Sequence, residues 1–283
     1  MKTTEFFKAK TVLSFEIFPP KPTSPIDTIY KTLDGMKDLK PDFISVTYGA
    51  AGSNNCNHTF QIASDIRNHY GIESIAHLSC KGLDKAEIAE KLAELKALEI
   101  DNVLALRGDD PDGSGDFAYA SDLIRFIKEN SDLNVIAACY PEGHIECPSR
   151  VDDIRHLKLK VDAGAEHLVS QLFLDNDCFY SFLERCQIAG IHVPIEAGIM
   201  PVVNRTQIER MTSLCGATIP KKFAKMLERY GDDPIAMRDA GIAYAVNQIV
   251  DLITQGVDGI HLYTMNNPYI AQKIYEAVYN LIK

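Results

Sequence analysis

The chain has 283 residues, of which 46% are hydrophobic and 24% charged, and its formal net charge is -10. This is enough apolar material for one large core, so we predict a single domain over residues 1–283, and the acidic balance argues against a nucleic-acid partner. The first ten residues lack the apolar core of a signal peptide and no stretch reaches the roughly 18 apolar residues of a membrane span, so we expect no membrane contact and a cytoplasmic location.

The first predicted strand lies in the stretch VLSFEIFPPK, residues 12–21. Its apolar residues have the composition of a buried strand, and Pro19 and Pro20 end it because neither can donate to a strand ladder. Glu16 places a carboxylate at the end of this run, where it must be paired, protonated or used. From this stretch alone, a structural ion pair and a functional acid remain equal alternatives.

The pattern of strand, loop and helix then repeats along the chain. Ser24 in front of a proline predicts a capped helix start, Asp84 and Glu87 predict a capping box, and Ser149 predicts another cap. Further strands are predicted at residues 43–48, 74–79, 102–106, 134–140, 167–174, 193–202 and 257–263. Helices are predicted at residues 58–70, from 84, at 119–129, from 149, around 179–186, as two or three helices in 204–255, and from 268.

Eight such units with continuously apolar strands predict an α/β fold, a single (β/α)8 (TIM) barrel with extra helices in the seventh crossover. An open doubly wound sheet is the alternative, but no Gly-x-Gly-x-x-Gly follows the first strand. In a barrel, function concentrates at the carboxyl ends of the strands. Those ends carry Glu16, Thr47, Tyr48, His77, Arg107, Gly108, Asp109, Tyr140, Gln171, Met200 and Tyr263.

These strand-end residues lack an evident nucleophile with its base. Only Glu16, His77 and Asp109 could hold a divalent metal, and the seven scattered cysteines include no CxxC pair, so we expect no metal and no disulfide framework. Tyrosines that pack on rings, an arginine for a phosphate or an anionic ring, and acids for proton transfer suit a bound planar cofactor.

Ten short blocks resemble the methylenetetrahydrofolate reductase family in order and in spacing, from about residue 11 to about residue 275. They are FEIFPPK, ISVTYGA, AHLSC, ALRGD, YASDL, YPEGH, KVDAGAEHLVSQLFLD, GIMPV, ATIP and HLYTMN. The resemblance implies a flavin-containing barrel that reduces 5,10-methylenetetrahydrofolate to 5-methyltetrahydrofolate in one-carbon metabolism and methionine supply. Hydride would pass from NADH or NADPH to flavin N5 and then to the folate.

The resemblance also implies roles for individual residues. Glu16 matches the acid that protonates folate N10 and opens the five-membered ring, a role that requires a protonated carboxyl. Asp109 matches the acid between flavin and pterin. Positions that match flavin contacts are Thr47, Tyr48, His77, Arg107, Gly108, Asp109, Tyr119, Ala120, Tyr140, His144, Cys147, Asp153, His156 and Lys160. Positions that match substrate contacts are Glu16, Asp109, Gln171, Gln207, Tyr263 and Asn267.

Two departures from the enterobacterial-type members concern the ends of the cofactor and of the substrate. His156 and Leu159 stand where those members carry Asn and Arg near the adenosine of the flavin, so we expect FAD while FMN stays open. Asn267 stands where they carry an Arg, so the folate tail needs another cation. The candidates for that cation are Lys221, Lys222 and Lys225.

The assembly is expected to be a homo-oligomer without the regulatory domain of animal members and without inhibition by S-adenosylmethionine. A second, cysteine-rich subunit, as in some anaerobic relatives with FMN, stays open. Two other functions are weighed against the reductase. A flavin-free barrel lyase or aldolase would need a strand-end lysine, which is lacking, and a flavin or folate storage protein would show no turnover.

Overall fold

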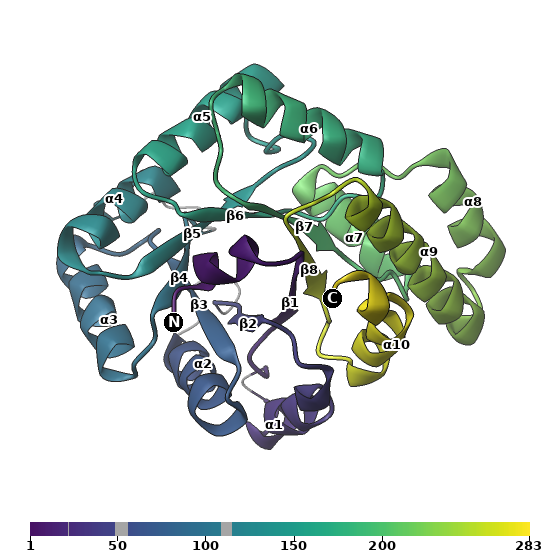
Figure 1. The fold of residues 1–283 in the computed structure, drawn as a ribbon, viewed down its shortest axis with the longest axis horizontal. Helices are drawn as coiled ribbons and strands as arrows, with labels where there is room; N and C mark the ends of the chain where they lie inside the picture. Colours follow the sequence, from purple (N-terminus) through teal and green to yellow (C-terminus); the bar gives the residue numbers. More distant parts are fainter. Residues whose placement is uncertain (22, 49–55, 109–114) are drawn as a thin grey trace.

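In the computed structural model, the described residues are 1–21, 23–48, 56–108 and 115–283. Eight parallel strands form a closed barrel in chain order, and β1 also pairs with β8 (Figure 1). The strands are β1 (Val12–Ile17), β2 (Phe43–Val46), β3 (Glu73–Ser79), β4 (Asn102–Leu106), β5 (Asn134–Cys139), β6 (His167–Ser170), β7 (Ile195–Ile199) and β8 (Gly259–Tyr263). The predicted (β/α)8 barrel is confirmed.

Helices surround the barrel as an outer ring (Figure 1). They are α1 (Asp27–Asp34), α2 (Cys56–Tyr70), α3 (Lys85–Ala97), α4 (Ala120–Asn130), α5 (Arg150–Asp162), α6 (Asn176–Ile188), α7 (Arg205–Cys215), α8 (Lys221–Tyr230), α9 (Pro234–Thr254) and α10 (Pro268–Val278). The seventh crossover holds α7, α8 and α9, which confirms the predicted extra helices. Gly241 lets α9 approach the end of β7, because a Cβ there would lie 1.7 Å from the Val202 carbonyl oxygen.

A short 3-10 helix, Thr3–Lys8, closes the amino-terminal end of the barrel. Its Phe6 and Phe7 pack against the inward side chains Val12, Phe43, Ile75, Leu104, Ile136 and Val169. No element was predicted here, because the segment is short and mixes charged with apolar residues. With this end plugged by aromatic rings, the carboxyl ends of the strands are left as the open face.

Three local predictions were wrong: the start of the first helix and the lengths of the sixth and seventh strands, the seventh being Ile195–Ile199 rather than residues 193–202. Ser24 does not cap α1, which begins at Asp27 after Ile26 and has no side-chain cap, because backbone turns lead the chain into the helix. The sixth strand ends at Ser170 rather than at residue 174. The apolar Leu172 and Leu174 pack against the crossover helices instead of extending the sheet. The Asp84 capping box and the Ser149 cap are confirmed.

Candidate active site

Glu16 meets two histidines at the open end of the barrel. Its Oε2 lies 3.5 Å from Nε2 of His261 on β8 and 3.7 Å from Nε2 of His77 on β3. Glu16 points inward because the alternate residues Phe15 and Ile17 face the helices and fill the main core. Its side chain is 20% exposed, so it is the member of this group that a ligand could reach.

His77 is uncharged at neutral pH. Burial lowers its pKa to about 4, which the carboxylate of Glu16 opposes and the neighbouring His261 reinforces. Its Nε2 has no hydrogen-bond partner among the described residues. A neutral imidazole beside Glu16 can hydrogen-bond the carboxyl without adding a full charge.

The segment after β8 holds the backbone of Glu16 in place. Thr264 Oγ1 donates to the Glu16 carbonyl oxygen at 2.6 Å. Asn266 accepts from the Phe18 N–H at 3.0 Å and donates to the Phe18 carbonyl oxygen at 2.8 Å. The turn requires the left-handed region, with φ of 50° at Met265 and 54° at Asn266, and asparagine tolerates this region better than most residues.

Tyr263 lies across the same end of the barrel. Its hydroxyl donates to the Ser170 carbonyl oxygen at 2.7 Å. A Cβ at Gly198 would lie 2.8 Å from this hydroxyl and 2.2 Å from the same carbonyl, so glycine makes the arrangement possible. Burial, with a smaller contribution from Glu16, raises the pKa of Tyr263 well above its usual value, and the phenol stays protonated.

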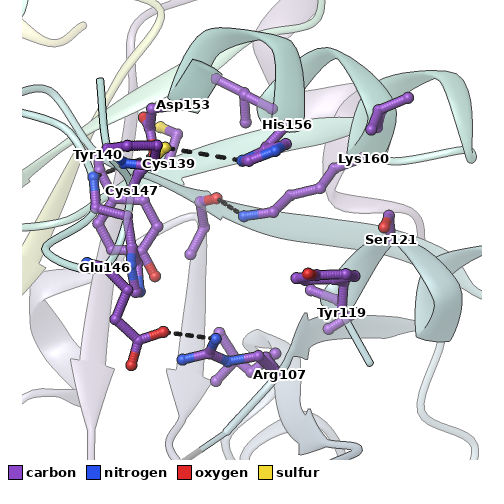
Figure 2. Close-up of a pocket in the computed structure, with 18 residues that line it drawn as sticks. Arg107, Tyr119, Ser121, Cys139, Tyr140, Glu146, Cys147, Asp153, His156 and Lys160 are labelled. Atoms are coloured by element: carbon purple, nitrogen blue, oxygen red, sulfur yellow. Dashed lines mark hydrogen bonds and ion pairs between the residues drawn. The ribbon is translucent and has the colours of Figure 1, made fainter. Parts of the chain in front are cut away.

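A cavity of about 500 Å³ opens at the carboxyl ends of β4 and β5, beside α4 and α5 (Figure 2). Nine of the residues predicted to contact the cofactor line it, namely Arg107, Tyr119, Ala120, Tyr140, His144, Cys147, Asp153, His156 and Lys160. These residues lie directly after β4 and β5, in the loop after β5, at the start of α4 and along α5. The barrel topology therefore brings together positions that are 53 residues apart, from 107 to 160.

The cavity contains buried positive charge. Lys160 Nζ donates to the Ala138 carbonyl oxygen at 2.9 Å and lies 5.5 Å from the centre of the Tyr140 ring. Burial lowers its pKa, and no carboxylate of the described residues lies within 4.0 Å of Nζ to compensate the charge. Such a cation suits an anionic ligand such as a phosphate.

Arg107 supplies a second cation at the other side of the cavity, 2.7 Å from Glu146 Oε2 (Figure 2). Burial, together with Arg107, lowers the pKa of His144, so this imidazole is neutral at pH 7. Cys147 Sγ lies 3.8 Å from His156 Nδ1 at the α5 side. Aromatic rings between two cations can take a planar ligand that carries negative charge.

The other described residues that were predicted to contact the cofactor are not in the lining of this cavity. Thr47, Tyr48, His77 and Gly108 do not line this cavity, and Asp109 lies outside the described residues. Gly108 has φ of 87°, and a Cβ there would lie 1.9 Å from Ser79 Oγ, so the position requires glycine.

Three of the residues predicted to contact the substrate lie directly after a strand or at the start of a helix. Gln171 Oε1 accepts from the Leu172 N–H at 2.8 Å, and Gln207 is half-buried in the first turn of α7. Asn267 caps α10, with its Oδ1 accepting from the Ile270 N–H at 3.3 Å.

Sequence reasoning missed His261 and Glu146. His261 is two residues before Tyr263 on the same strand, so the alternation of side chains in a strand would have placed both inside the barrel. Glu146 lies in the loop after the fifth strand, whose acid could have been proposed as the counter-ion of Arg107. Within the described residues no three His, Cys, Asp or Glu side chains are grouped as a metal site, and no helix of this part of the chain could cross a membrane.

Sequence comparisons with known proteins point to one family. A family model described as methylenetetrahydrofolate reductase matches residues 2–279. The 5,10-methylenetetrahydrofolate reductase of Escherichia coli (strain K12) is 36% identical over 263 residues, covering 93% of this chain and 88% of that protein. A probable methylenetetrahydrofolate reductase (NADH) of Oryza sativa subsp. japonica is also 36% identical, over 275 residues, and this chain spans about half of its length, 46%.

A solved structure shares the barrel fold. An uncharacterized protein from Clostridium thermocellum that binds two copies of 5-methyl-5,6,7,8-tetrahydrofolic acid superposes with a TM-score of 0.61 at 15% identity. The match covers 96% of both chains.

Proposed function

This chain belongs to the methylenetetrahydrofolate reductase family, and on that premise we propose that it reduces 5,10-methylenetetrahydrofolate to 5-methyltetrahydrofolate through a bound flavin. The observation that carries the proposal is the position of Glu16. It is the acid that a ring-opening step requires, and it lies at the open end of the barrel between two histidines. The flavin-free lyase is disfavoured because the described strand ends still offer no lysine for a Schiff base.

The cavity beside α5 fits a flavin. Lys160 would hold a phosphate, Arg107 the anionic part of the ring or a phosphate, and Tyr140 would pack against a ring. When bound, the flavin accepts hydride from the reduced nicotinamide and gives it to the folate. We propose FAD, because the same cavity continues from Lys160 along α5 to His156 and Leu159, where a second nucleotide half could lie, and FMN is the alternative.

Proton transfer is the task of the protein in the folate half-reaction. Glu16 donates a proton to N10, the N10–C bond breaks, and its electron pair stays on N10. The iminium carbon at N5 then accepts hydride. His77, which is neutral, and Tyr263, which stays protonated, would keep the surroundings of Glu16 free of cations that favour its ionised form. Asp109, outside the described residues, is proposed to hydrogen-bond the pterin.

The remaining substrate contacts are proposed from their positions around the open face. Gln171 and Gln207 would bind the pterin end and the benzoyl group, while Asn267 lies at the start of α10. One of Lys221, Lys222 and Lys225 on α8 would bind the glutamate carboxylates of the tail. NADH is the donor that we propose, since rice and Arabidopsis thaliana relatives are named as NADH enzymes, and NADPH is the alternative.

Replacing Glu16 with Gln tests the function. The variant should retain its flavin and its NADH oxidation by a quinone acceptor. Its methylenetetrahydrofolate reduction should fall by about two to four orders of magnitude, which is the usual contribution of a general acid. Steady-state rates of both half-reactions measure this. Glu142→Gln is the matched control, because Glu142 lies at the same end of the barrel and its Oε1 accepts from the Thr218 N–H, an interaction that an amide keeps.

Two results would contradict the proposal in different ways. Wild-type rates of folate reduction in Glu16→Gln would remove Glu16 as the acid. A wild-type protein that takes up no flavin on reconstitution would remove the flavin-dependent reaction altogether.

A further inference from the structure

Below Glu16, the barrel interior holds a second acid that solvent does not reach. Glu196 lies on β7 and its side chain is 0% exposed. Barrel interiors are normally filled with branched apolar side chains, and a buried carboxyl is costly unless it is hydrogen-bonded and paired. The flavin cavity does not include Glu196, so its burial calls for a separate explanation.

One hydroxyl group connects Glu196 with His261. Ser14 Oγ lies 2.6 Å from Glu196 Oε1 and 2.7 Å from His261 Nδ1, and all three side chains are fully buried. The opposite nitrogen of the ring, Nε2, lies 3.5 Å from Glu16 Oε2. That distance is longer than a hydrogen bond, as catalytic contacts often are before substrate binds. Glu196, Ser14, His261 and Glu16 thus form a line of side chains that runs from the fully buried acid to the partly exposed one.

The single hydrogen of the Ser14 hydroxyl allows two arrangements along this line. If Ser14 donates to ionised Glu196, His261 must carry its proton on Nδ1, and its Nε2 lone pair then faces a protonated Glu16. If Glu196 is protonated and donates to Ser14, Ser14 donates to Nδ1, and the Nε2–H of His261 faces an ionised Glu16. Both arrangements hold the same number of protons and the same net charge.

We propose that Glu16 and Glu196 share one proton through His261 and Ser14, and that Glu196 is a positioning residue that keeps Glu16 able to act as general acid. In one direction, the Glu196 proton passes to Ser14, the Ser14 proton to Nδ1, and the Nε2 proton to Glu16. No electrons leave the line and no further reactant is needed. This inference rests on the proposed function, because it takes Glu16 as the acid.

Sharing favours the arrangement in which one of the two acids keeps a proton. Two carboxylates linked through one imidazole and one hydroxyl would repel each other more strongly than in water, because the groups between them are buried. The other titratable groups around the line are His77 and Tyr263 near Glu16, and His167 and Asp258 near Glu196. Among the described residues, no Lys or Arg lies within 4.0 Å of either acid.

Three variants of the holoprotein test the shared proton. Glu196→Gln removes the second carboxyl at nearly constant shape, and Ser14→Ala breaks the line. Ser45→Ala is the control, because Ser45 is a fully buried serine on the neighbouring β2 whose Oγ has no hydrogen-bond partner among the described residues. The measurements are the pH profile of methylenetetrahydrofolate reduction and, in parallel, that of NADH oxidation by a quinone.

We expect Glu196→Gln to move the alkaline limb of the folate profile toward acid by about one pH unit. The rate near neutral pH should then drop about tenfold and recover at lower pH, and Ser14→Ala should shift the limb in the same direction. Ser45→Ala should keep the wild-type profile, and no variant should shift the quinone profile. An equal loss at every pH, or a similar shift in Ser45→Ala, would overturn the proposal.

A second measurement requires no turnover. Nitrogen NMR of histidine-labelled holoprotein, with the His261 signals assigned by their loss in His261→Gln, reports which ring nitrogen carries the proton. Glu196→Gln should change this balance in the wild-type background and leave it unchanged in the Ser14→Ala background. An equal response in both backgrounds would refute the line through Ser14. If folate were not reduced but this response were seen, only the proposed function would fail.

Discussion

Lys160 is the residue on which the cofactor proposal can be tested most directly. It reaches the cavity from the last turn of α5 and carries a buried charge, and no carboxylate of the described residues lies within 4.0 Å of its Nζ. We expect Lys160→Met to weaken flavin binding by about tenfold or more, because a charge-assisted hydrogen bond to a phosphate contributes about 1.5–3 kcal/mol. Fluorescence titration of the apoprotein with FAD and with FMN measures the loss.

Lys158 provides the matched control for this prediction. It lies two residues earlier on the same helix, and its Nζ pairs with Asp162 at the surface. Lys158→Met should bind flavin as the wild type does. Equal losses in both variants would show that charge on α5 in general, rather than the buried Lys160, attracts the cofactor.

His77 makes the stability of the protein depend on pH. Its pKa is lowered to about 4 in the folded state, while the unfolded chain takes up the proton near the ordinary value of 6.5. Below 6.5 the unfolded state therefore binds more protons, so stability falls as the pH drops to about 4 and then levels off. The full effect is on the order of 3 kcal/mol.

Urea unfolding at several pH values checks this expectation by comparison of variants. His77→Asn should flatten the fall in unfolding free energy between pH 6.5 and 4. His69→Asn, which changes an exposed histidine on α2, should keep the wild-type slope. A wild-type slope in His77→Asn would assign the pH dependence to other groups.

At the scale of elements, the contact between the segments after β1 and β8 holds the backbone of Glu16. Asn266 makes two hydrogen bonds to Phe18 and adopts φ of 54°. Asn266→Ala removes both bonds and adds strain, whereas Asn266→Gly removes the bonds and tolerates the conformation. We expect losses of stability of about 2–4 kcal/mol for Ala and about 1–3 kcal/mol for Gly, measured by urea unfolding.

Both variants should also lower folate reduction more than NADH oxidation by a quinone, because Glu16 is proposed to act only in the folate half-reaction. A parallel loss of both activities would mean that the turn stabilises the barrel without positioning the acid.

Local sequence patterns predicted most helices and strands, because the residue preferences and cap hydrogen bonds behind these predictions involve residues close together in the chain. Residues 102–106 form a strand as predicted, and the Asp84 capping box forms because both of its hydrogen bonds join residues three apart. The predicted Ser24 cap failed because the turn that precedes α1 is made by backbone groups. The sixth strand was predicted too long because apolar residues in this fold also pack under crossover helices, and composition does not separate the two environments.

At the scale of the whole molecule, the barrel rule predicted a site at the carboxyl ends of the strands, and nine of the residues predicted to contact the cofactor line one cavity at that end. It could not predict which residues meet across the barrel. The contact of Ser14 with Glu196 joins positions 182 residues apart, and that of Ser14 with His261 joins positions 247 apart. Such pairs depend on how the strands are aligned with one another when the barrel closes, and no local sequence pattern encodes this alignment.

The pairing of β1 with β8 also determines when the site can form during synthesis. Glu16 is made well before Thr264, which is 248 residues later and whose hydroxyl holds the Glu16 carbonyl. At about 5–20 residues per second, the ribosome needs tens of seconds to produce this partner. A nascent chain therefore carries an acid that has no finished surroundings until nearly all of the barrel has been translated. Pairing of the last strand with the first is therefore a late event in the completion of the site.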